Sequence, residues 1–596
     1  MPEPPAQEPR PSGPDGTMSP IRVWAPRAAR VGLVLEGVEH EMAPEGESGW
    51  WAAPVRAGHG ARYAFRLDGG EPLPDPRSRW QPDGVHAPSA AYDHARFAWT
   101  DGRWPGRALP GAVAYELHVG TFTPEGTLDA AGERLDHLLG LGITHVELLP
   151  VAAFDGPHGW GYDGAHLGAV HQPYGGPDAL KRFVDRAHAA GLGVVLDVVY
   201  NHLGPSGNYL PAFGPYFTDR HQTPWGAAVN LDAPGSEEVR RWIIDNACAW
   251  LRDFHLDGLR LDAVHALEDD RALHLLEELA AEVDALAVAL NRPLFLVAES
   301  DQNDPRLVTP REAGGLGIHA QWSDDFHHAL HALLTGERQG YYADFGSLAT
   351  LAHTLTRVFL HDGSWSSFRG RRHGRPVDAR RIPGWRFLGY LQDHDQVGNR
   401  ANGERISATL SPGRLAIGAA LVLTAPFTPM LFMGEEWAAA TPWAFFSSFP
   451  DPELGRAVSE GRRREFASHG WDAAEVPDPQ DPGTFASSKL DWSEPGREPH
   501  ASALAWYRRL IALRRQHGEL SDPRLDRVRC AVDEEARTLV VHRGRLRVAV
   551  NLDAAPRTIG LDGPGRGLLA ASAGDAALAG SVLHLPAESV AIVELA

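Results

Sequence analysis

The chain contains 596 residues, of which 43% are hydrophobic and 22% are charged, and its formal net charge is -21. A chain of this length divides into more than one hydrophobic core, and the composition is that of a globular protein. The negative charge argues against nucleic acid and anionic membranes as partners, because both attract basic surfaces.

The first elements predicted along the chain are a polar tail and a small β domain. Residues 1–18 are rich in Pro and Glu and lack the apolar core of a signal peptide, so we expect a disordered tail. Residues 19–107 carry short alternating runs among many Gly and Pro residues, for example Val31–Leu35 and Tyr63–Leu67. These runs predict an N-terminal β-sandwich.

The middle of the chain, residues 108–520, alternates short apolar runs with longer segments of helical periodicity. The clearest helix is Pro177–Gly191, which begins with Pro and ends with Gly. Such repeated units predict an α/β fold, a (β/α)8 TIM barrel, with a long loop after its third strand. The eight predicted strands are Val113–Val119, His145–Pro150, Gly193–Val199, Gly258–Ala263, Leu294–Ala298, Ile318–Trp322, Phe387–Gln392 and Phe427–Met433.

Residues 521–596 return to short alternating runs, including Arg547–Leu552 and Ser589–Glu594, and predict a C-terminal β-sandwich. The only two cysteines, Cys248 and Cys530, are far apart in the sequence and suggest neither a disulfide framework nor a metal cluster. The sequence also has no run approaching the roughly 18 apolar residues of a membrane span. We therefore expect a cytoplasmic protein.

Four of the predicted strands end in a segment that carries a carboxylate. The third ends in DVVYNH (197–202), the fourth in DGLRLDAVH (257–265), the fifth in LVAES (296–300), and the seventh strand leads into DHDQ (393–396). A barrel opens its active site at these ends. A single such aspartate is more often a helix cap, but four sites in order, with His and Arg residues among them, favour a catalytic set.

Asp262 and Glu299 have the surroundings expected for the two carboxyl groups of a glycosidase. Side chains alternate along a strand, so Arg260 and Asp262 share a face, and the guanidinium should keep Asp262 ionised, as a nucleophile must be. Glu299 follows the apolar run Phe295–Ala298, so we expect a raised pKa, as a general acid needs. This pairing predicts a retaining enzyme whose two carboxyl groups lie about 5–5.5 Å apart.

The four segments resemble the four signature regions of the α-amylase superfamily of glycoside hydrolases, and the resemblance covers nearly the whole chain. Trp24–Pro26 resembles the start of the N-terminal sandwich of its branching and debranching members. More detailed strings resemble the maltooligosyltrehalose trehalohydrolases of that superfamily. They are YELHVGTF (115–122), AESDQNDPR (298–306), WSDDFHH (322–328), DQVGNR (395–400) and GRRREF (461–466).

The resemblance implies cleavage of the α-1,4 bond next to the terminal trehalose of maltooligosyl trehalose, which releases trehalose, without a cofactor or a metal. It implies Asp262 as the nucleophile, Glu299 as the acid/base and Asp395 as the residue that stabilises the transition state. The sequence agrees that there is no calcium site, because no loop has an oxygen-rich pattern such as an EF-hand. The substrate-binding positions expected around the trio are Asp197, His202, Arg260, His265 and His394.

One position departs from the superfamily, whose seventh-strand motif usually reads Asn-His-Asp. In this sequence Asp393 stands before His394. If the strand continued that far, alternation would place Asp393 on the same face as Asp395 and raise the pKa values of neighbouring carboxyl groups.

Selection of the leaving trehalose requires groups outside the catalytic trio. The candidates are Trp225 in the long loop and the run Trp322–His328 after the sixth strand, which includes Asp324. Tyr162 and Asp163, after the second strand, could hold the non-reducing sugar ring, since relatives stack a Tyr on the sugar there. Asp324 and its neighbour Asp325 are equally good candidates for capping the helix that follows. For Gly434–Trp437, after the eighth strand, we expect a structural role.

Two other functions remain open. The first is glycogen branching or debranching by a member of the same superfamily. The second, from another class, is a glycan-binding barrel without catalysis, although such proteins typically lack at least one of the three carboxylates found here. A barrel with a phosphate site is disfavoured, because no Gly-rich loop is followed by Lys.

Overall fold

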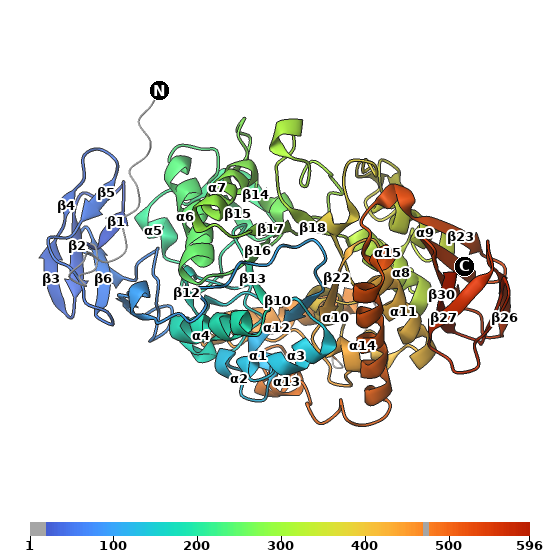
Figure 1. Cartoon of the computed structure of the whole chain (residues 1–596). Helices are drawn as coiled ribbons and strands as arrows, with labels where there is room; N and C mark the ends of the chain where they lie inside the picture. Colours follow the sequence, from blue (N-terminus) through green and yellow to red (C-terminus); the bar gives the residue numbers. More distant parts are fainter. Residues whose placement is uncertain (1–19, 469–475) are drawn as a thin grey trace.

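The computed structural model describes residues 20–468 and 476–596, so the predicted tail, residues 1–18, lies outside the described residues. Figure 1 shows three parts in a row: a small N-terminal β domain, a central α/β part and a C-terminal β domain. Among the described helices, none has the length and apolar character that crossing a membrane requires.

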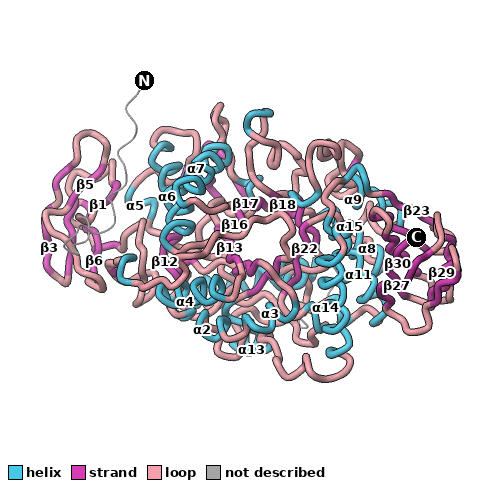
Figure 2. Tube along the Cα trace, in the orientation of Figure 1, coloured by secondary structure: helices cyan, strands magenta, loops and turns pink. Residues whose placement is uncertain are grey.

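Eight parallel strands close into a barrel in the central part. In their order around the ring they are β9 (Ala114–Leu117), β10 (His145–Leu148), β13 (Gly193–Val198), β16 (Gly258–Leu261), β17 (Phe295–Ala298), β18 (Ala320–Trp322), β21 (Phe387–Gly389) and β22 (Thr428–Phe432). Each lies within a predicted strand, so the predicted barrel is confirmed. The strands form a ring in the middle of the molecule with helices outside it (Figure 2).

The helices outside the ring follow the barrel strands along the chain. The longer ones are α4 (Gly176–Ala189), α6 (Ser236–Asp253), α7 (Leu275–Leu290), α8 (Asp324–Thr335), α11 (Pro412–Thr424) and α14 (His500–Gln516). The predicted helix Pro177–Gly191 corresponds to α4. It ends near its predicted limit because Gly191 has a φ of 81°, a left-handed conformation that side-chain-bearing residues rarely adopt.

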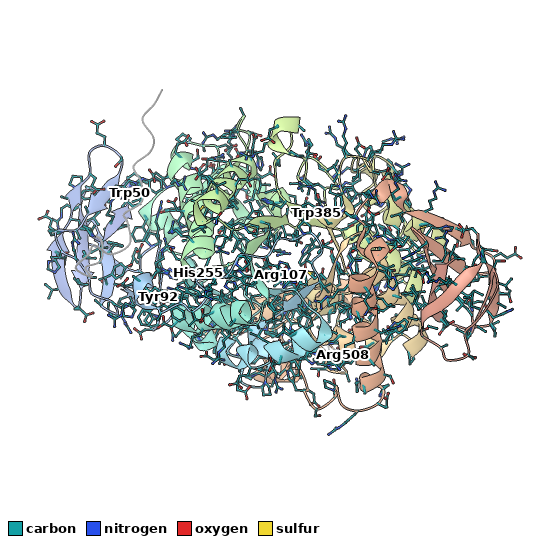
Figure 3. The ribbon with its side chains drawn as sticks, viewed as in Figure 1. Trp50, Tyr92, Arg107, His255, Trp385 and Arg508 are labelled. Carbon is teal, nitrogen blue, oxygen red and sulfur yellow. The ribbon has the colours of Figure 1, made fainter. Side chains whose placement is uncertain are left out.

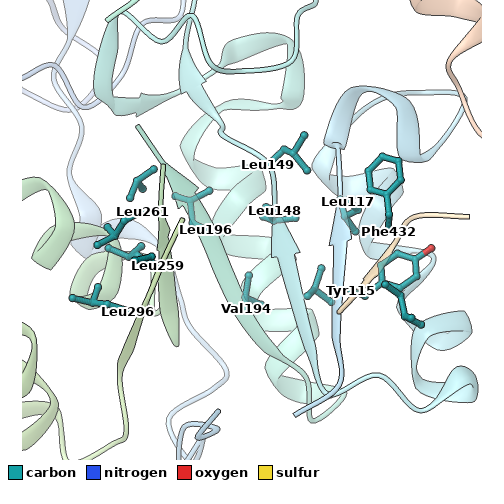
Figure 4. Packing of buried hydrophobic residues seen from close by; sticks show 14 of the residues in the cluster. Tyr115, Leu117, Leu148, Leu149, Val194, Leu196, Leu259, Leu261, Leu296 and Phe432 are labelled. Carbon is teal, nitrogen blue, oxygen red and sulfur yellow. The ribbon is translucent and has the colours of Figure 1, made fainter. Parts of the chain in front are cut away.

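Alternation along the barrel strands separates two layers of side chains. Leu148, Leu196 and Leu259, from neighbouring strands, pack in the large core shared with the surrounding helices (Figure 4). Val195 and Trp322 belong to a separate, smaller cluster, which fills the inside of the barrel. A polar side chain therefore points toward the barrel axis only where it occupies an inward-facing position of its strand.

Arg260 follows that inward alternation. It lies between Leu259 and Leu261, which both pack in the outer core, and its own side chain is fully buried. The predicted division of this strand into an apolar and a polar face is confirmed. Glu116, Glu147 and Asp197 are buried in neighbouring strands, so one layer near the barrel mouth is rich in charged groups.

Two β domains flank the barrel, as predicted. In the N-terminal domain one sheet pairs β1 (Arg22–Trp24), β5 (Trp50–Ala52) and β4 (Ala43–Pro44), and another pairs β3 (Val38–Glu41), β2 (Val31–Leu35), β6 (Arg62–Leu67) and β7 (Pro72–Leu73). The main C-terminal sheet pairs β23 (Arg529–Asp533), β24 (Thr538–Arg543), β25 (Leu546–Asn551), β30 (Ser589–Leu595) and β27 (Gly565–Ala571). The domain boundaries after residues 107 and 520 stay predictions.

A buried network joins the segment before β9 to the barrel. His188 of α4 places Nδ1 2.8 Å from an oxygen of Asp101 and Nε2 3.0 Å from an oxygen of Asp257. His255 Nδ1 also lies 2.8 Å from an oxygen of Asp101. Figure 3 labels His255 and, near it, Arg107. Because Asp257 immediately precedes β16, this network lies at the amino ends of the strands, where barrel residues serve stability.

Candidate active site

Arg260 joins three of the predicted site carboxylates at the carboxyl ends of the strands. Its Nη1 donates to Asp197 Oδ2 at 2.7 Å and to Asp262 Oδ1 at 2.9 Å. Its Nη2 lies 2.9 Å from Glu299 Oε2. The guanidinium also lies 4.3 Å from the centre of the Trp322 ring. One fully buried cation thus brings together groups from β13, β16 and β17.

A strained turn connects the two central carboxylates. Ala263, directly after Asp262, has a φ of 38°. This left-handed conformation costs a residue with a side chain of the order of 1–3 kcal/mol. In this position the Ala263 N–H donates to Glu299 Oε2 at 2.8 Å. The turn therefore fixes Glu299 relative to the strand end that carries Asp262.

The pKa shifts of this pair differ from the prediction. Burial raises the pKa of Asp262 well above its usual range, and Arg260 offsets only part of this. Burial also raises the pKa of Glu299, but Arg260, the Ala263 N–H and two histidines outweigh it and leave that pKa below its ordinary value. Both directions are opposite to those expected from the sequence. The physical reason is that several carboxylates share Arg260, so each raises the pKa of its neighbours and their titrations are linked.

His394, the first residue of α10 (His394–Gly398), is a buried cation beside this group. Its Nδ1 lies 2.6 Å from Glu116 Oε1, and its Nε2 lies 2.7 Å from the Tyr162 hydroxyl. Burial lowers the pKa of His394, but Glu116 and two aspartates outweigh it and raise that pKa to about 10. Both ring nitrogens therefore donate, and the Tyr162 hydroxyl in turn donates to Asp197 Oδ2 at 2.6 Å.

Asp395 and Asp393 occupy different environments. Asp395 lies in the first turn of α10, its side chain is 39% exposed, and its Oδ1 accepts from Asn399 Nδ2 at 3.2 Å. Asp393 is buried and caps the same helix by accepting the Gln396 N–H at 2.8 Å. Because β21 ends before this segment, strand alternation does not apply to it. The seventh strand does not continue as far as Asp395, so the two aspartates do not share a strand face.

His202 and Trp225 form a stacked pair beside Tyr162. The two rings lie 4.5 Å apart with an angle of 2° between their planes, and His202 Nε2 lies 3.1 Å from the Tyr162 carbonyl oxygen. Burial lowers the pKa of His202 to about 4, so the ring is neutral. Trp225 is 49% exposed and lies between β14 (Phe217–Thr223) and β15 (Gly226–Val229), in the long loop after the third barrel strand. His202 and His394, two of the three predicted histidines, thus use Nε2 on Tyr162 rather than leaving it free for a sugar hydroxyl.

Asp324 and Asp325 follow the sixth barrel strand, but neither caps α8. The cap position is Ser323, whose side chain makes no capping hydrogen bond. The Asp324 carboxylate accepts from the Tyr390 hydroxyl, and burial raises its pKa to about 7. Asp325 accepts two backbone N–H groups of the segment after α9 (Leu348–Arg357) and has a structural role.

The remaining predictions concern His265 and Gly434–Trp437. His265 lies in a short helical turn after Asp262, with Nδ1 3.9 Å from Asp301 Oδ1. Glu436 is fully buried and contacts His137 Nε2 at 2.7 Å, which agrees with the structural role expected for its segment.

Sequence reasoning missed Glu116, and it named Trp322 in the string WSDDFHH without its contact with Arg260. Glu116 lies on β9 between Tyr115 and Leu117, which both pack in the outer core. A charged residue between two apolar ones in a buried strand was the available signal for an inward carboxylate. The position of Trp322 beside Arg260 had no local signal, because the contact joins strands that are far apart in the sequence.

Comparison with known proteins identifies the family of this chain. Residues 92–213 match the family described as alpha amylase, catalytic domain, residues 9–81 match carbohydrate-binding module 48 (isoamylase N-terminal domain), and residues 523–592 match a domain of unknown function, DUF3459. The chain is 58% identical to a malto-oligosyltrehalose trehalohydrolase of Arthrobacter ramosus, over 96% of this chain and 99% of that protein. It is 55% identical to one of Mycobacterium tuberculosis, over 92% and 94%.

A solved structure of a candidate alpha amylase from Salmonella typhimurium has a TM-score of 0.88 and 38% identity, over 96% of this chain and 97% of that one. Identity at this level over nearly the full length establishes the family. The chain belongs to the malto-oligosyltrehalose trehalohydrolase family of alpha-amylase-type glycoside hydrolases.

Proposed function

We propose that this protein hydrolyses the α-1,4-glucosidic bond next to the terminal trehalose of maltooligosyl trehalose, with retention at the anomeric carbon, and releases trehalose. The observation that carries the proposal is the Arg260 guanidinium, which contacts Asp197, Asp262 and Glu299 at the barrel mouth. A buried cation between paired carboxyl groups suits a substitution at the anomeric carbon during which both carboxyl groups change their charge. The names of the relatives support the choice of substrate.

In the first step Asp262 is the nucleophile. Its carboxylate oxygen forms a bond to the anomeric carbon, while the bond from that carbon to the glycosidic oxygen breaks. Glu299 gives its proton to that oxygen, so trehalose leaves as a neutral alcohol. This retaining mechanism requires the two carboxyl groups to lie about 5–5.5 Å apart.

In the second step water breaks the ester to Asp262. Glu299, now ionised, takes a proton from the water as its oxygen attacks the anomeric carbon. The Asp262 carboxylate leaves with its electron pair, and Glu299 is protonated again. The maltooligosaccharide is then free to leave, and both carboxyl groups have returned to their starting charges.

In this proposal, substrate binding changes which of the two carboxyl groups, Asp262 or Glu299, holds a proton. In the protein alone, the pKa of Asp262 is raised and that of Glu299 is lowered, so the surroundings favour a proton on Asp262 over one on Glu299. Because interacting carboxyl groups titrate as one set, a hydrogen bond from Glu299 to the glycosidic oxygen favours the protonated form of Glu299. Binding of the substrate would then leave Asp262 ionised and ready to attack.

Asp395 completes the proposed catalytic trio. It is partly exposed, so its carboxylate can reach sugar hydroxyls and favour the positively charged, distorted ring of the transition state. We assign substrate contacts to Tyr162, Trp225, His265 and Asp324, which lie around the barrel mouth. Arg260, Asp197, His202 and His394 orient these groups, and we extend the proposal to a cytoplasmic enzyme without a metal.

Product analysis separates this function from its alternatives. The protein is incubated with maltooligosyl trehalose and, separately, with glycogen. Trehalose from the first substrate is the expected result. A change in the number of α-1,6 branches in glycogen, without trehalose, would establish the branching or debranching alternative instead. Binding of either glycan without any product would establish the non-catalytic alternative.

A further inference from the structure

The turn after α10, Gly398–Arg400, is held by side chains from two other segments of the chain. We call it the α10 turn. It directly follows the short helix that carries Asp395. Two of the strings identified in the sequence meet at it: DQVGNR includes the turn, and GRRREF lies in α12 (Pro452–Ser468), whose Arg462 contacts the turn.

Glu337, just beyond the end of α8, holds the turn through Arg400. Its Oε1 lies 3.0 Å from Arg400 Nη2, and its Oε2 lies 3.1 Å from Arg400 Nη1, which makes a two-pronged ion pair. The same Oε2 lies 2.9 Å from His331 Nε2, so a residue of α8 fixes the carboxylate from behind. Both ion-pair partners are less than a quarter exposed, with side-chain exposures of 21% and 23%. A two-pronged, half-buried pair fixes direction as well as distance.

Arg462 of α12 holds the backbone of the same turn. Its Nη2 donates to the Gly398 carbonyl oxygen at 2.6 Å and to that of Arg400 at 3.4 Å. Its guanidinium lies 4.5 Å from the centre of the Phe466 ring, and its side chain is only 8% exposed. The turn is therefore held at two carbonyl groups by Arg462 and at the Arg400 side chain by Glu337, with Glu404 accepting from Arg400 Nε at 2.8 Å.

The α10 turn makes direct contact with Asp395. The Asn399 N–H donates to the Asp395 carbonyl oxygen at 2.9 Å, and Asn399 Nδ2 donates to its carboxylate at 3.2 Å. A shift of the turn must therefore displace or rotate this carboxylate. The other charged contact of the Asp395 carboxylate is with His394 Nε2, 3.7 Å from the same Oδ1. No arginine pairs with it among the described residues, so the Asn399 amide, at 3.2 Å, makes the shorter of its two polar contacts.

We infer that Glu337 and Arg462 are positioning residues that act through the α10 turn on the Asp395 carboxylate. The inference rests on the proposed role of Asp395 in the transition state. A carboxylate that favours the transition state must be held closely, and a displacement of the order of 1 Å can cost about 100-fold in rate.

Glu337→Gln tests the inference. The side chain keeps its size but loses its charge. The carboxylate accepts from two N–H groups of Arg400 and one of His331, and the new NH2 group must face at least one of these donors. The two-pronged ion pair is therefore lost. We expect kcat to fall about 10- to 100-fold while KM changes by less than about threefold, because the contact matters mainly in the transition state. The matched control is Glu588→Gln. Glu588 pairs with Arg414 at 2.7 Å with 25% exposure on each side, far along the chain from α10, and its loss should leave kcat unchanged.

A double-variant cycle shows whether Glu337 acts through Asp395. In an Asp395→Asn background, Glu337→Gln should lower the residual kcat by less than about twofold, since the group it positions is already disabled. Arg462→Lys, which keeps the charge but cannot span both carbonyl oxygens, should show the same split between kcat and KM, so the test does not depend on one variant folding. An unchanged kcat in both single variants would overturn the inference. So would a loss of kcat from Glu337→Gln that is as large in the Asp395→Asn background as in the wild type. Near-normal turnover of Asp395→Asn alone would instead overturn the proposed role of Asp395.

Discussion

The Glu116 carboxylate and the His394 imidazole form a buried pair, 2.6 Å apart, although 278 positions separate them in the chain. Glu116 comes from the first barrel strand and His394 follows the seventh. The pair holds the imidazole in its charged form, since Glu116 is the largest of the causes that raise the pKa of His394. It also orients the ring toward Tyr162 and, through it, toward Asp197.

Glu116→Gln should move the alkaline limb of the pH–rate profile. Without the Glu116 charge, the pKa of His394 falls below about 10, because burial is then opposed only by the two aspartates. The charged imidazole exists only below its pKa, so kcat/KM should fall as the pH rises through this lower value. Measurement of kcat/KM between about pH 5 and 9 detects the shift.

Glu147→Gln is the matched control for that variant. Glu147 is the direct neighbour of Glu116 in the pairing of β9 and β10. Burial, with help from two neighbouring carboxylates, raises the pKa of Glu147 well above its usual range, so its surroundings favour the uncharged acid. Replacing it with a neutral amide should leave the pH profile in place. Equal shifts in the two variants would contradict the assignment of His394 as the titrating group.

Glu299→Ala should lower turnover of maltooligosyl trehalose by several orders of magnitude, because trehalose is a poor leaving group without a proton. A maltooligosyl fluoride needs little protonation of its leaving group. Release of fluoride in the first turnover should therefore be much less affected by this change, whereas Asp262→Ala should abolish turnover of both substrates. A burst of fluoride in a stopped-flow experiment measures the difference. Equal losses of both substrates in Glu299→Ala would remove the acid role from Glu299.

Trp225→Ala should weaken substrate binding. The indole stacks on His202 and is 49% exposed, so it offers an aromatic surface beside the site. Loss of such a contact costs about 0.5–1.5 kcal/mol, which corresponds to an increase in KM of up to about tenfold. Steady-state kinetics with maltooligosyl trehalose and with a plain maltooligosaccharide, with Trp225→Phe as control, show whether the ring acts on one substrate or both. Unchanged KM values for both substrates would exclude Trp225 from the binding surface.

His188→Gln should destabilise the barrel in a pH-dependent way. Burial lowers the pKa of His188, but Asp101 and Asp257 outweigh it and raise that pKa. The stability due to the charged imidazole is fully present below its unfolded pKa, about 6.5, and is lost as the pH rises through the folded value. Leaving the two carboxylates without their shared partner should cost about 3–5 kcal/mol near pH 6.

Thermal melting at several pH values tests this expectation. The melting temperature of His188→Gln should lie furthest below that of the wild type near pH 6, and the gap should narrow at alkaline pH. The control is His86→Gln. His86 lies 3.3 Å from Asp155 but is 53% exposed, so its loss should cost less than about 1 kcal/mol. A gap that widens with rising pH would contradict the charged state of His188.

The sequence alone determined the properties that depend on neighbouring residues. The two-residue period of β16 placed Leu259 and Arg260 on opposite faces, and Gly191 marked the end of α4, because strand alternation and left-handed backbone are local properties. The order of short apolar runs determined the barrel for the same reason.

Only the tertiary structure decided which groups share a proton or a charge. It placed Asp262 and Glu299 on one guanidinium, reversed the pKa shifts expected for them, and paired His394 with Glu116. It also made Asp393 a helix cap, because the seventh strand is shorter than its apolar pattern suggested. Protonation depends on burial and on charges a few ångströms away through space, and in a barrel those charges come from strands that are distant in the sequence.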